Sequence, residues 1–124
     1  MSTSQDAVNP KHYKSHPSGI ECIEIRRHLT SNRADAIKYL WRLGKKDESN
    51  QELRKAIWYL NDEANHFGHA PAYHYVSLSV LNAKLNKLAL YQSDMEEKLF
   101  YFIVFGGENS LRLAITIIEG MLDE

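Results

Sequence analysis

The sequence predicts an all-α protein that forms a single compact domain of five or six helices. Its 124 residues are about the length of one ordinary domain, and 44% of them are apolar. A serine followed three residues later by a glutamate, the capping-box signature of a helix start, occurs at Ser18, Ser49 and Ser93. Apolar residues spaced three and four apart follow these sites, and the chain contains no convincing sheet pattern.

The N-terminal part of the chain is predicted to lack a helix. Residues 1–8 are polar and are expected to be a flexible terminus, whereas residues 9–124 form the helical domain. Pro10 and Pro17 oppose a helix between them. This stretch is dense in side chains that could contact a ligand, so we interpret it as an arm that folds over a site: His12, Tyr13, Lys14 and His16.

Two helices are expected next. Ser18 caps the first, with Glu21 at its third helical position, and this helix runs to about Leu29. Asn32 caps the second helix and Gly44 ends it. The second helix carries an apolar stripe at helical spacing, formed by Ala34, Ile37, Leu40 and Trp41.

A third helix follows the capping box of Ser49 and Glu52 and ends within residues 65–71. Its apolar stripe is the clearest in the chain and comprises Leu53, Ala56, Ile57, Leu60 and Ala64. We expect Trp41 and Trp58 to lie in the core that the second and third helices share.

Residues 72–124 are expected to supply the C-terminal helices. Residues 73–91 begin with alternating valine and serine, which would suit a strand, but their leucines repeat as in a helix pair, and we predict a helix. The next helix runs from the Ser93 capping box to Gly106 and Gly107. The last one carries Leu111, Ala114, Ile117, Ile118, Met121 and Leu122.

Charge is distributed unevenly along a chain whose net charge is only −1. Residues 11–55 hold eleven Lys or Arg and six Asp or Glu, whereas residues 56–124 hold four and nine. The basic part favours an anionic partner. The acidic part would oppose the field on which binding to duplex nucleic acid relies, so we expect a small anion such as a nucleotide.

A ridge of cations is the strongest candidate for holding phosphate. Helical spacing places four of them on one face, namely Lys38, Arg42, Lys45 and Lys46. Lys55 follows on the third helix, and Tyr39 and Tyr59 could present faces to a base. No glycine-rich phosphate loop is present, so side chains and helix N-termini would bind the phosphates. The alternative is an ordinary solvated charged surface.

Two patterns could hold a metal ion. Glu21 and Glu24 stand one helical turn apart, as in a magnesium-binding pair, although Glu21 also serves the capping box. His66 and His69 form an HxxH pair, which needs further ligands to bind zinc and is common by chance. Magnesium at Glu21 is thus the metal candidate that we retain.

Cellular location and assembly follow from simpler features. Cys22 is the only cysteine, which favours a reducing compartment. The first ten residues lack the apolar core of a signal peptide, and the longest mostly apolar run, Leu99 to Phe105, is too short to cross a bilayer. We expect a cytoplasmic protein without a membrane partner. The chain is too small to enclose a deep pocket easily, so we also expect a homo-oligomer.

Four segments together resemble the SaV-like family of small tailed-phage proteins (DUF3310 type). They are VNPKHYK at 8–14, SGIECIEI at 18–25, AIKYLWRLGKKD at 36–47 and LRKAIWYL at 53–60. The resemblance covers residues 8–63, so that we divide the domain into a SaV-like part at 9–64 and the C-terminal helices. It implies a bacteriophage protein that acts in the cytoplasm of the host cell. A podovirus nucleotide kinase, which phosphorylates deoxynucleoside monophosphates, is among the relatives.

The resemblance implies a nucleotide site. It would comprise Asn9, His12, Tyr13, Glu21, Asn32, Lys38, Tyr39, Arg42, Lys45, Asp47, Lys55 and Tyr59. The chain departs from the family pattern at Ser31, Ala34 and Asp35, where Phe, Gly and Asn are usual. Asp35 adds negative charge where a phosphate could approach the helix N-terminus.

Three hypotheses for function follow. The first is a deoxynucleoside monophosphate kinase-like enzyme without a P-loop, using ATP and Mg²⁺, with Lys38, Arg42 and Asp47 as catalytic residues and Glu21 as a metal ligand. The second is a non-catalytic oligomer that binds or sequesters a nucleotide, or modulates a host protein. The third is an interaction protein whose C-terminal helices assemble. Substrate contacts are assigned to Asn9, His12, Tyr13, Lys14, Asn32, Tyr39, Lys45, Lys46, Lys55 and Tyr59.

Overall fold

The computed structural model describes residues 16–42, 49–67 and 78–122. These ranges contain six helices and no strand, which confirms the predicted all-α class. In chain order they are α3 (Cys22–Arg26), α4 (Ser31–Trp41), α5 (Ser49–Phe67), α6 (Leu78–Ala89), α7 (Asp94–Phe105) and α8 (Glu108–Met121). The predictions for residues 1–8 and for the arm before His16 lie outside the described residues.

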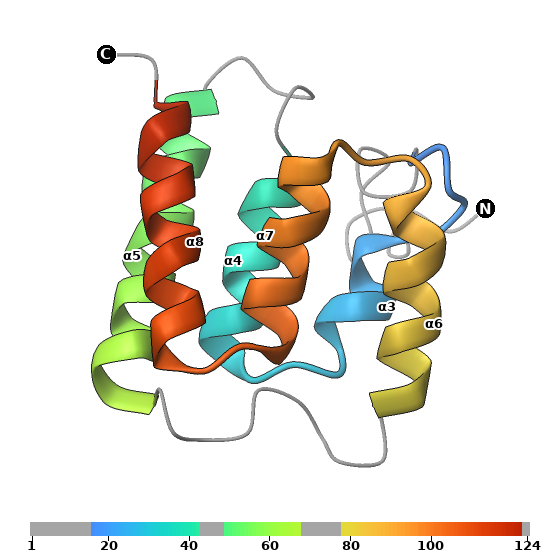
Figure 1. The fold of residues 1–124 in the computed structure, drawn as a ribbon, viewed down its shortest axis with the longest axis horizontal. Helices are drawn as coiled ribbons and strands as arrows, with labels where there is room; N and C mark the ends of the chain where they lie inside the picture. Colours follow the sequence, from blue (N-terminus) through green and yellow to red (C-terminus); the bar gives the residue numbers. More distant parts are fainter. Residues whose placement is uncertain (1–15, 43–48, 68–77, 123–124) are drawn as a thin grey trace, which may run out of the picture.

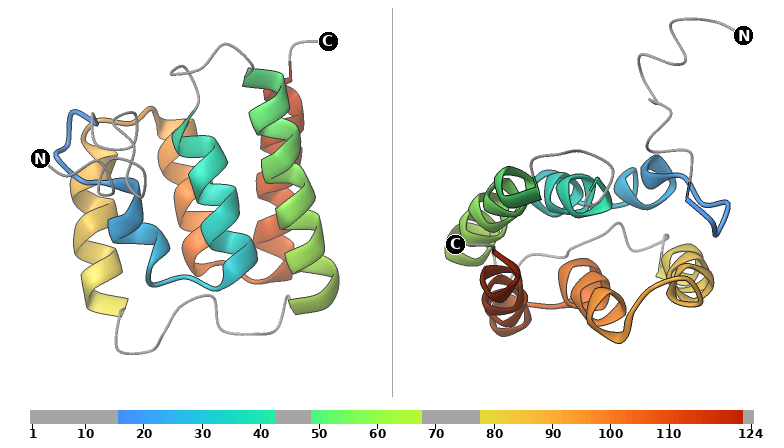
Figure 2. Two further views of the ribbon diagram at one scale, coloured as in Figure 1. Left: turned by 180° about the vertical axis from the view of Figure 1, so that it is seen from behind. Right: turned by 90° about the horizontal axis from the view of Figure 1, so that it is seen from above.

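The helices are arranged in two layers that face each other (Figures 1 and 2). One layer contains α3, α4 and α5 side by side, and the other contains α6, α7 and α8. Helix α5 packs along both α4 and α8, while α4 also contacts α7. The two layers enclose a single apolar core, so the described helices form one compact domain.

The core is built from the apolar stripes that the sequence predicted. Helix α4 buries Ile37 and Leu40, and α5 buries Ala56 and Leu60. Of residues 73–91, which could have begun as a strand or a helix, the described part is helical from Leu78 to Ala89 and buries Leu81, Leu85 and Leu88. These positions fit a helix because they lie on one face at spacings of four and three residues.

The first helix begins later than predicted. Ser18 is not its cap, because the Ser18 hydroxyl oxygen accepts the backbone N–H of Ile20 (3.1 Å) in a turn. Glu21 is instead the N-cap residue of α3 and forms a capping box with Glu24, whose carboxylate accepts the Glu21 N–H at 2.6 Å. Gly19 has a φ of 79°, a left-handed conformation that favours glycine and that turns the chain into this helix.

Other predicted helix ends are partly corrected. Thr30 is the N-cap of α4, so Asn32 lies inside the first turn, and α4 ends at Trp41 before the predicted stop at Gly44. Ser49 is already helical rather than a cap. The Ser93 capping box is confirmed: Ser93 accepts the Glu96 N–H at 3.2 Å, and α7 ends before Gly106.

The prediction that both tryptophans are buried was half wrong. Trp41 is 5% exposed and lies in the core, but Trp58 is 61% exposed. The buried face of α5 carries Ala56 and Leu60, two residues to either side of Trp58. At 100° per residue, position 58 points away from that face.

A buried ion pair that was not predicted from the sequence joins α4 to α5, and its arginine also reaches the other layer. Arg33 on α4 is fully buried and donates through Nε to the Glu63 carboxylate at 2.8 Å. Its Nη1 also donates to the backbone carbonyls of Ile103 (2.9 Å) and Gly106 (2.6 Å) at the end of α7. One side chain therefore ties α4 to α5 and to α7.

A more exposed ion pair joins α3 to α6. Lys84 Nζ lies 2.7 Å from a Glu24 carboxylate oxygen. Burial by itself would raise the pKa of Glu24, but the Glu21 backbone N–H and the Lys84 ammonium outweigh it and lower that pKa below its usual value.

We expect this pair to make stability depend on pH in the acid range. A carboxyl group whose pKa is lowered by folding stabilises the folded state above its unfolded pKa, near 4.5, and loses this contribution as the pH falls through the folded pKa. Glu24→Gln should therefore cost less than about 1 kcal/mol at neutral pH, and nothing well below the folded pKa. Urea unfolding of both proteins at neutral and acid pH measures this. An equal cost of Glu24→Gln at both pH values would contradict it.

Candidate functional site

Side chains from α4 and α5 meet along one line on the surface of the protein. The two helices run antiparallel, and both present residues at spacings of three, four and three, with Lys38 as an additional residue on α4. We call this line the α4–α5 seam; it comprises Asn32, Asp35, Lys38, Tyr39 and Arg42 of α4 with Glu52, Lys55, Tyr59 and Asp62 of α5. Residues at such spacings share one helical face, which is why the contacts recur turn by turn.

Three cross-helix contacts define the seam from one end to the other. The Asn32 side-chain amide donates to the Asp62 carboxylate at 2.9 Å. In the middle, the rings of Tyr39 and Tyr59 stack with their centroids 5.8 Å apart and an interplanar angle of 17°. At the other end, the last contact of the seam is the Arg42–Glu52 ion pair. Hydrogen bonding, stacking and charge pairing therefore follow one another along the same pair of helices.

The centre of the seam combines aromatic rings with cations. Lys38 Nζ lies 4.5 Å from the centroid of the Tyr39 ring, and Lys55 Nζ lies 5.3 Å from it. Both distances are within the range of cation–π attraction. Lys38 also lies 3.8 Å from the Asp35 carboxylate. Two ammonium groups from different helices thus converge on one ring.

Tyr59 remains a hydrogen-bond donor in this setting. The neighbouring Tyr39, followed by the negative charge of Asp35, raises the pKa of Tyr59 above its usual value. Like any tyrosine, Tyr59 is protonated at neutral pH, and a side-chain hydrogen bond with Tyr39 contributes to the raised pKa. Its hydroxyl can also contact a ligand that lies on the seam.

Arg42, the leading candidate for phosphate binding, is engaged by a carboxylate of its own chain. Its Nε lies 3.7 Å from Glu52 Oε2, and these side chains are only 15% and 5% exposed. Neither atom has a hydrogen-bond partner among the described residues. The pair is close enough for charge attraction but too long for a hydrogen bond. The seam as a whole is formally neutral, since Asp35, Glu52 and Asp62 balance its cations.

The structure brings together six of the predicted site residues on the seam: Asn32, Lys38, Tyr39, Arg42, Lys55 and Tyr59. Seven others lie outside the described residues: Asn9, His12, Tyr13, Lys14, Lys45, Lys46 and Asp47. Glu21 caps α3 and is not part of the seam. The sequence analysis missed Asp62, although its spacing from Lys55 and Tyr59 could have placed it on the same face.

Trp58 is a second residue next to the seam that the sequence analysis did not assign to a site. Its ring meets that of Tyr59 edge to face, with centroids 5.0 Å apart. Because Trp58 is exposed and Trp41 is buried, only Trp58 is placed to respond directly to a ligand on this surface.

The described residues do not form a metal site. They contain no group of three or more His, Cys, Asp or Glu side chains that could hold an ion. Glu24, the predicted partner of Glu21, pairs with Lys84. His66 lies 3.7 Å from Asp62, and its HxxH partner His69 is outside the described ranges.

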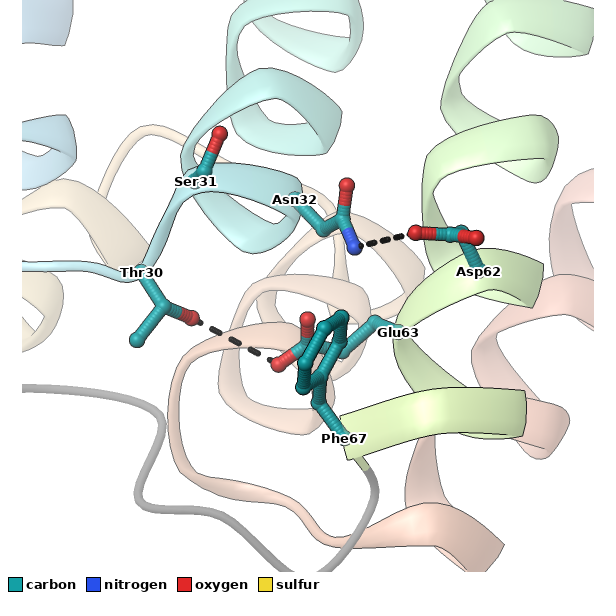
Figure 3. Close-up of a pocket in the computed structure, with 6 residues that line it drawn as sticks. All are labelled: Thr30, Ser31, Asn32, Asp62, Glu63 and Phe67. Atoms are coloured by element: carbon teal, nitrogen blue, oxygen red, sulfur yellow. Dashed lines mark hydrogen bonds between the residues drawn. The ribbon is translucent and has the colours of Figure 1, made fainter.

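A cavity of about 370 Å³ adjoins the Asn32–Asp62 end of the seam. Its lining comes from the start of α4 and the end of α5, as Figure 3 shows: Thr30, Ser31, Asn32, Asp62, Glu63 and Phe67. Thr30 donates to the Glu63 carboxylate at 3.5 Å across this cavity, beside the Asn32–Asp62 hydrogen bond.

Residues 8–61 match the family model of a protein of unknown function, DUF3310. The match covers 54 of the 124 residues, so this part of the chain is similar to that family. The DUF3310 segment contains α3, α4 and α5 up to Asn61, and therefore all of the seam except Asp62. No curated protein and no solved structure matches the chain. No helix in the described part of the chain is long and apolar enough to cross a membrane.

Proposed function

We propose that this protein binds a nucleotide, or another small phosphorylated ligand, on the α4–α5 seam. The observation that carries the proposal is the convergence of Lys38 and Lys55 on the Tyr39 ring. Because the two ammonium groups lie 4.5 and 5.3 Å from the centroid of this ring, a phosphate bound beside the ring could be contacted by both. The stacked tyrosines beside them offer apolar surface to the rest of such a ligand.

The carboxylates of the seam fit this proposal because they pair with the cations while no phosphate is bound. Asp35 balances Lys38 at 3.8 Å and Glu52 balances Arg42 at 3.7 Å, so the cations are oriented before a ligand arrives. Neither contact has the short geometry of a charge-assisted hydrogen bond. A phosphate oxygen can therefore compete for these cations at moderate cost, and orientation in advance lowers the entropy lost on binding.

The proposal has a catalytic and a non-catalytic form. The catalytic form is a deoxynucleoside monophosphate kinase-like reaction, as in the podovirus kinase of the SaV-like family. It would use ATP and Mg²⁺. Of the two carboxylates predicted to hold the metal, Glu21 caps α3 away from the seam, which leaves Asp47, outside the described residues. The non-catalytic form is an oligomer that binds or sequesters a nucleotide. Both forms need the same contacts to phosphate on the seam.

We expect Lys38→Ala and Lys55→Ala each to weaken nucleotide binding by about tenfold, because each removes one charge-assisted contact to phosphate. The emission of exposed Trp58 measures binding during titration with ATP, with each deoxynucleoside monophosphate and with inorganic pyrophosphate. Lys87→Ala is the matched control, since Lys87 is an exposed lysine on α6, which belongs to the other layer. If no probe changes the emission, or if all three variants bind alike, the proposal fails.

A second measurement separates the two forms. Purified protein is incubated with labelled ATP, Mg²⁺ and each deoxynucleoside monophosphate. New diphosphate that disappears in Lys38→Ala indicates a kinase. Binding without turnover, unaffected by chelation of Mg²⁺, indicates the non-catalytic form.

A further inference from the structure

The cavity at the end of the seam differs in charge from the seam's centre. Among the described residues, its lining carries two carboxylates, those of Asp62 and Glu63, and no cation; the Thr30 and Ser31 hydroxyls and the Asn32 amide complete the polar lining. Glu63 is 2% exposed and is already neutralised by Arg33 at 2.8 Å. Asp62 is more accessible, with a side chain that is 35% exposed. It therefore supplies the negative charge that a ligand in this cavity would meet.

Asp62 is held in place but retains capacity to accept hydrogen bonds. Its Oδ2 accepts the Asn32 amide at 2.9 Å, and its Oδ1 lies 3.7 Å from His66 Nε2, beyond hydrogen-bond distance. An ionised carboxylate has about four acceptor positions, of which one is used here. Phe67, with half of its surface exposed, forms an apolar wall of the same cavity.

The two ends of the seam differ in the charge that they would present to a phosphorylated ligand. A phosphate is repelled by the carboxylate of Asp62 and attracted by Lys38 and Lys55. Along α4, Lys38 stands about 9 Å from Asn32, given a rise of 1.5 Å per residue. That separation suits a nucleotide that lies along the seam with its phosphate at the lysines and its base in the cavity.

We infer that the cavity recognises a guanine base through Asp62; this inference rests on the proposed nucleotide function. A carboxylate accepts hydrogen bonds and donates none, so it selects a base edge with two adjacent donors. Guanine is the common base with that edge, formed by its N1–H and its 2-amino group. Phe67 supplies an aromatic face against which the guanine ring can stack. Asn32 donates to the Asp62 carboxylate and holds it in the required orientation.

The test compares three ligands on two proteins. Guanosine, inosine and xanthosine 5′-monophosphates are titrated against the full-length protein and against Asp62→Asn, with Trp58 emission as the readout. Inosine lacks the 2-amino group, and xanthosine carries a carbonyl in its place. The wild-type protein should prefer guanosine over inosine monophosphate by about tenfold, the value of one hydrogen bond to a charged group.

Asp62→Asn should reverse the order of the ligands. An asparagine amide can donate to the xanthine carbonyl while its oxygen accepts the N1–H, so xanthosine monophosphate should become the tightest ligand. The substitution keeps the size of the side chain and leaves an acceptor for Asn32. Asp94→Asn, at an exposed aspartate on α7, is the matched control and should leave the preference for guanine unchanged.

The outcomes distinguish this inference from the proposed function. Equal binding of all three monophosphates that Asp62→Asn does not alter would overturn guanine recognition while the phosphate site stands. Binding of free guanosine without binding of inorganic pyrophosphate would support the cavity and overturn the phosphate site. If neither nucleotides, guanosine nor pyrophosphate bind, both proposals are wrong.

Discussion

Replacement of Arg33 by methionine should destabilise the protein by about 3–5 kcal/mol, the cost of removing one partner from a buried ion pair. Glu63 would be left as a buried, unpaired carboxylate, since both side chains are almost fully inaccessible. The carbonyls of Ile103 and Gly106 would also lose the donor that they share. Urea unfolding followed by circular dichroism measures the change.

Two further variants show whether burial is the cause. Arg112→Met removes an exposed arginine that pairs with Glu108 at 3.1 Å, and it should cost less than about 1 kcal/mol. The double variant Arg33→Met/Glu63→Leu should recover much of the loss, because no buried charge remains without a partner. If Arg33→Met costs no more than Arg112→Met, the buried pair does not have the role that we assign to it.

Gly106→Ala should be the second strongly destabilising change, by roughly 1–3 kcal/mol. A β-carbon at this position would overlap the Ser110 side chain and the backbone carbonyl oxygen of Phe102. That carbonyl accepts the Gly106 N–H at 3.0 Å at the end of α7, so it cannot move without losing the hydrogen bond. Thermal and urea unfolding both report the loss.

Gly120 provides the matched control. It lies inside α8, and a β-carbon there meets no atom within 4 Å. Gly120→Ala should therefore stabilise the protein by up to about 1 kcal/mol, because alanine favours the helix. Equal effects of the two substitutions would contradict the tight packing described at Gly106.

Helices and their buried stripes could be predicted from the sequence because they depend on local spacing. Leu81, Leu85 and Leu88 repeat at helical intervals, and this pattern was sufficient to choose a helix over a strand. Helix starts were harder to predict, since several serines and glutamates could each serve as the N-cap residue. At Ser18 the hydroxyl stabilises a turn and leaves the cap to Glu21, a choice that depends on the chain around it.

The candidate site was predictable in part for the same reason. Lys38, Tyr39 and Arg42 share one face of a single helix, and the sequence shows this spacing directly. Spacing places Glu52 and Asp62 on the face of Lys55 and Tyr59, but their pairing with Arg42 and Asn32 could not be inferred, because the register between two helices depends on how their apolar faces pack. Arg33 was missed because a charged residue inside a helix is normally exposed. Its burial depends on Glu63 and on carbonyls some seventy residues away.

The border of the DUF3310 match does not coincide with a border in the folded molecule. The match stops at residue 61, inside α5. However, α5 packs along α8, and Arg33 donates a hydrogen bond to the Gly106 carbonyl at the end of α7. A fragment that ends at that border would expose the apolar face of α5 to solvent. It would also lack Glu63, the carboxylate that pairs with Arg33. The layer formed by α6, α7 and α8 therefore covers the apolar face of the layer that contains the recognisable motifs. Neither layer is expected to fold without the other.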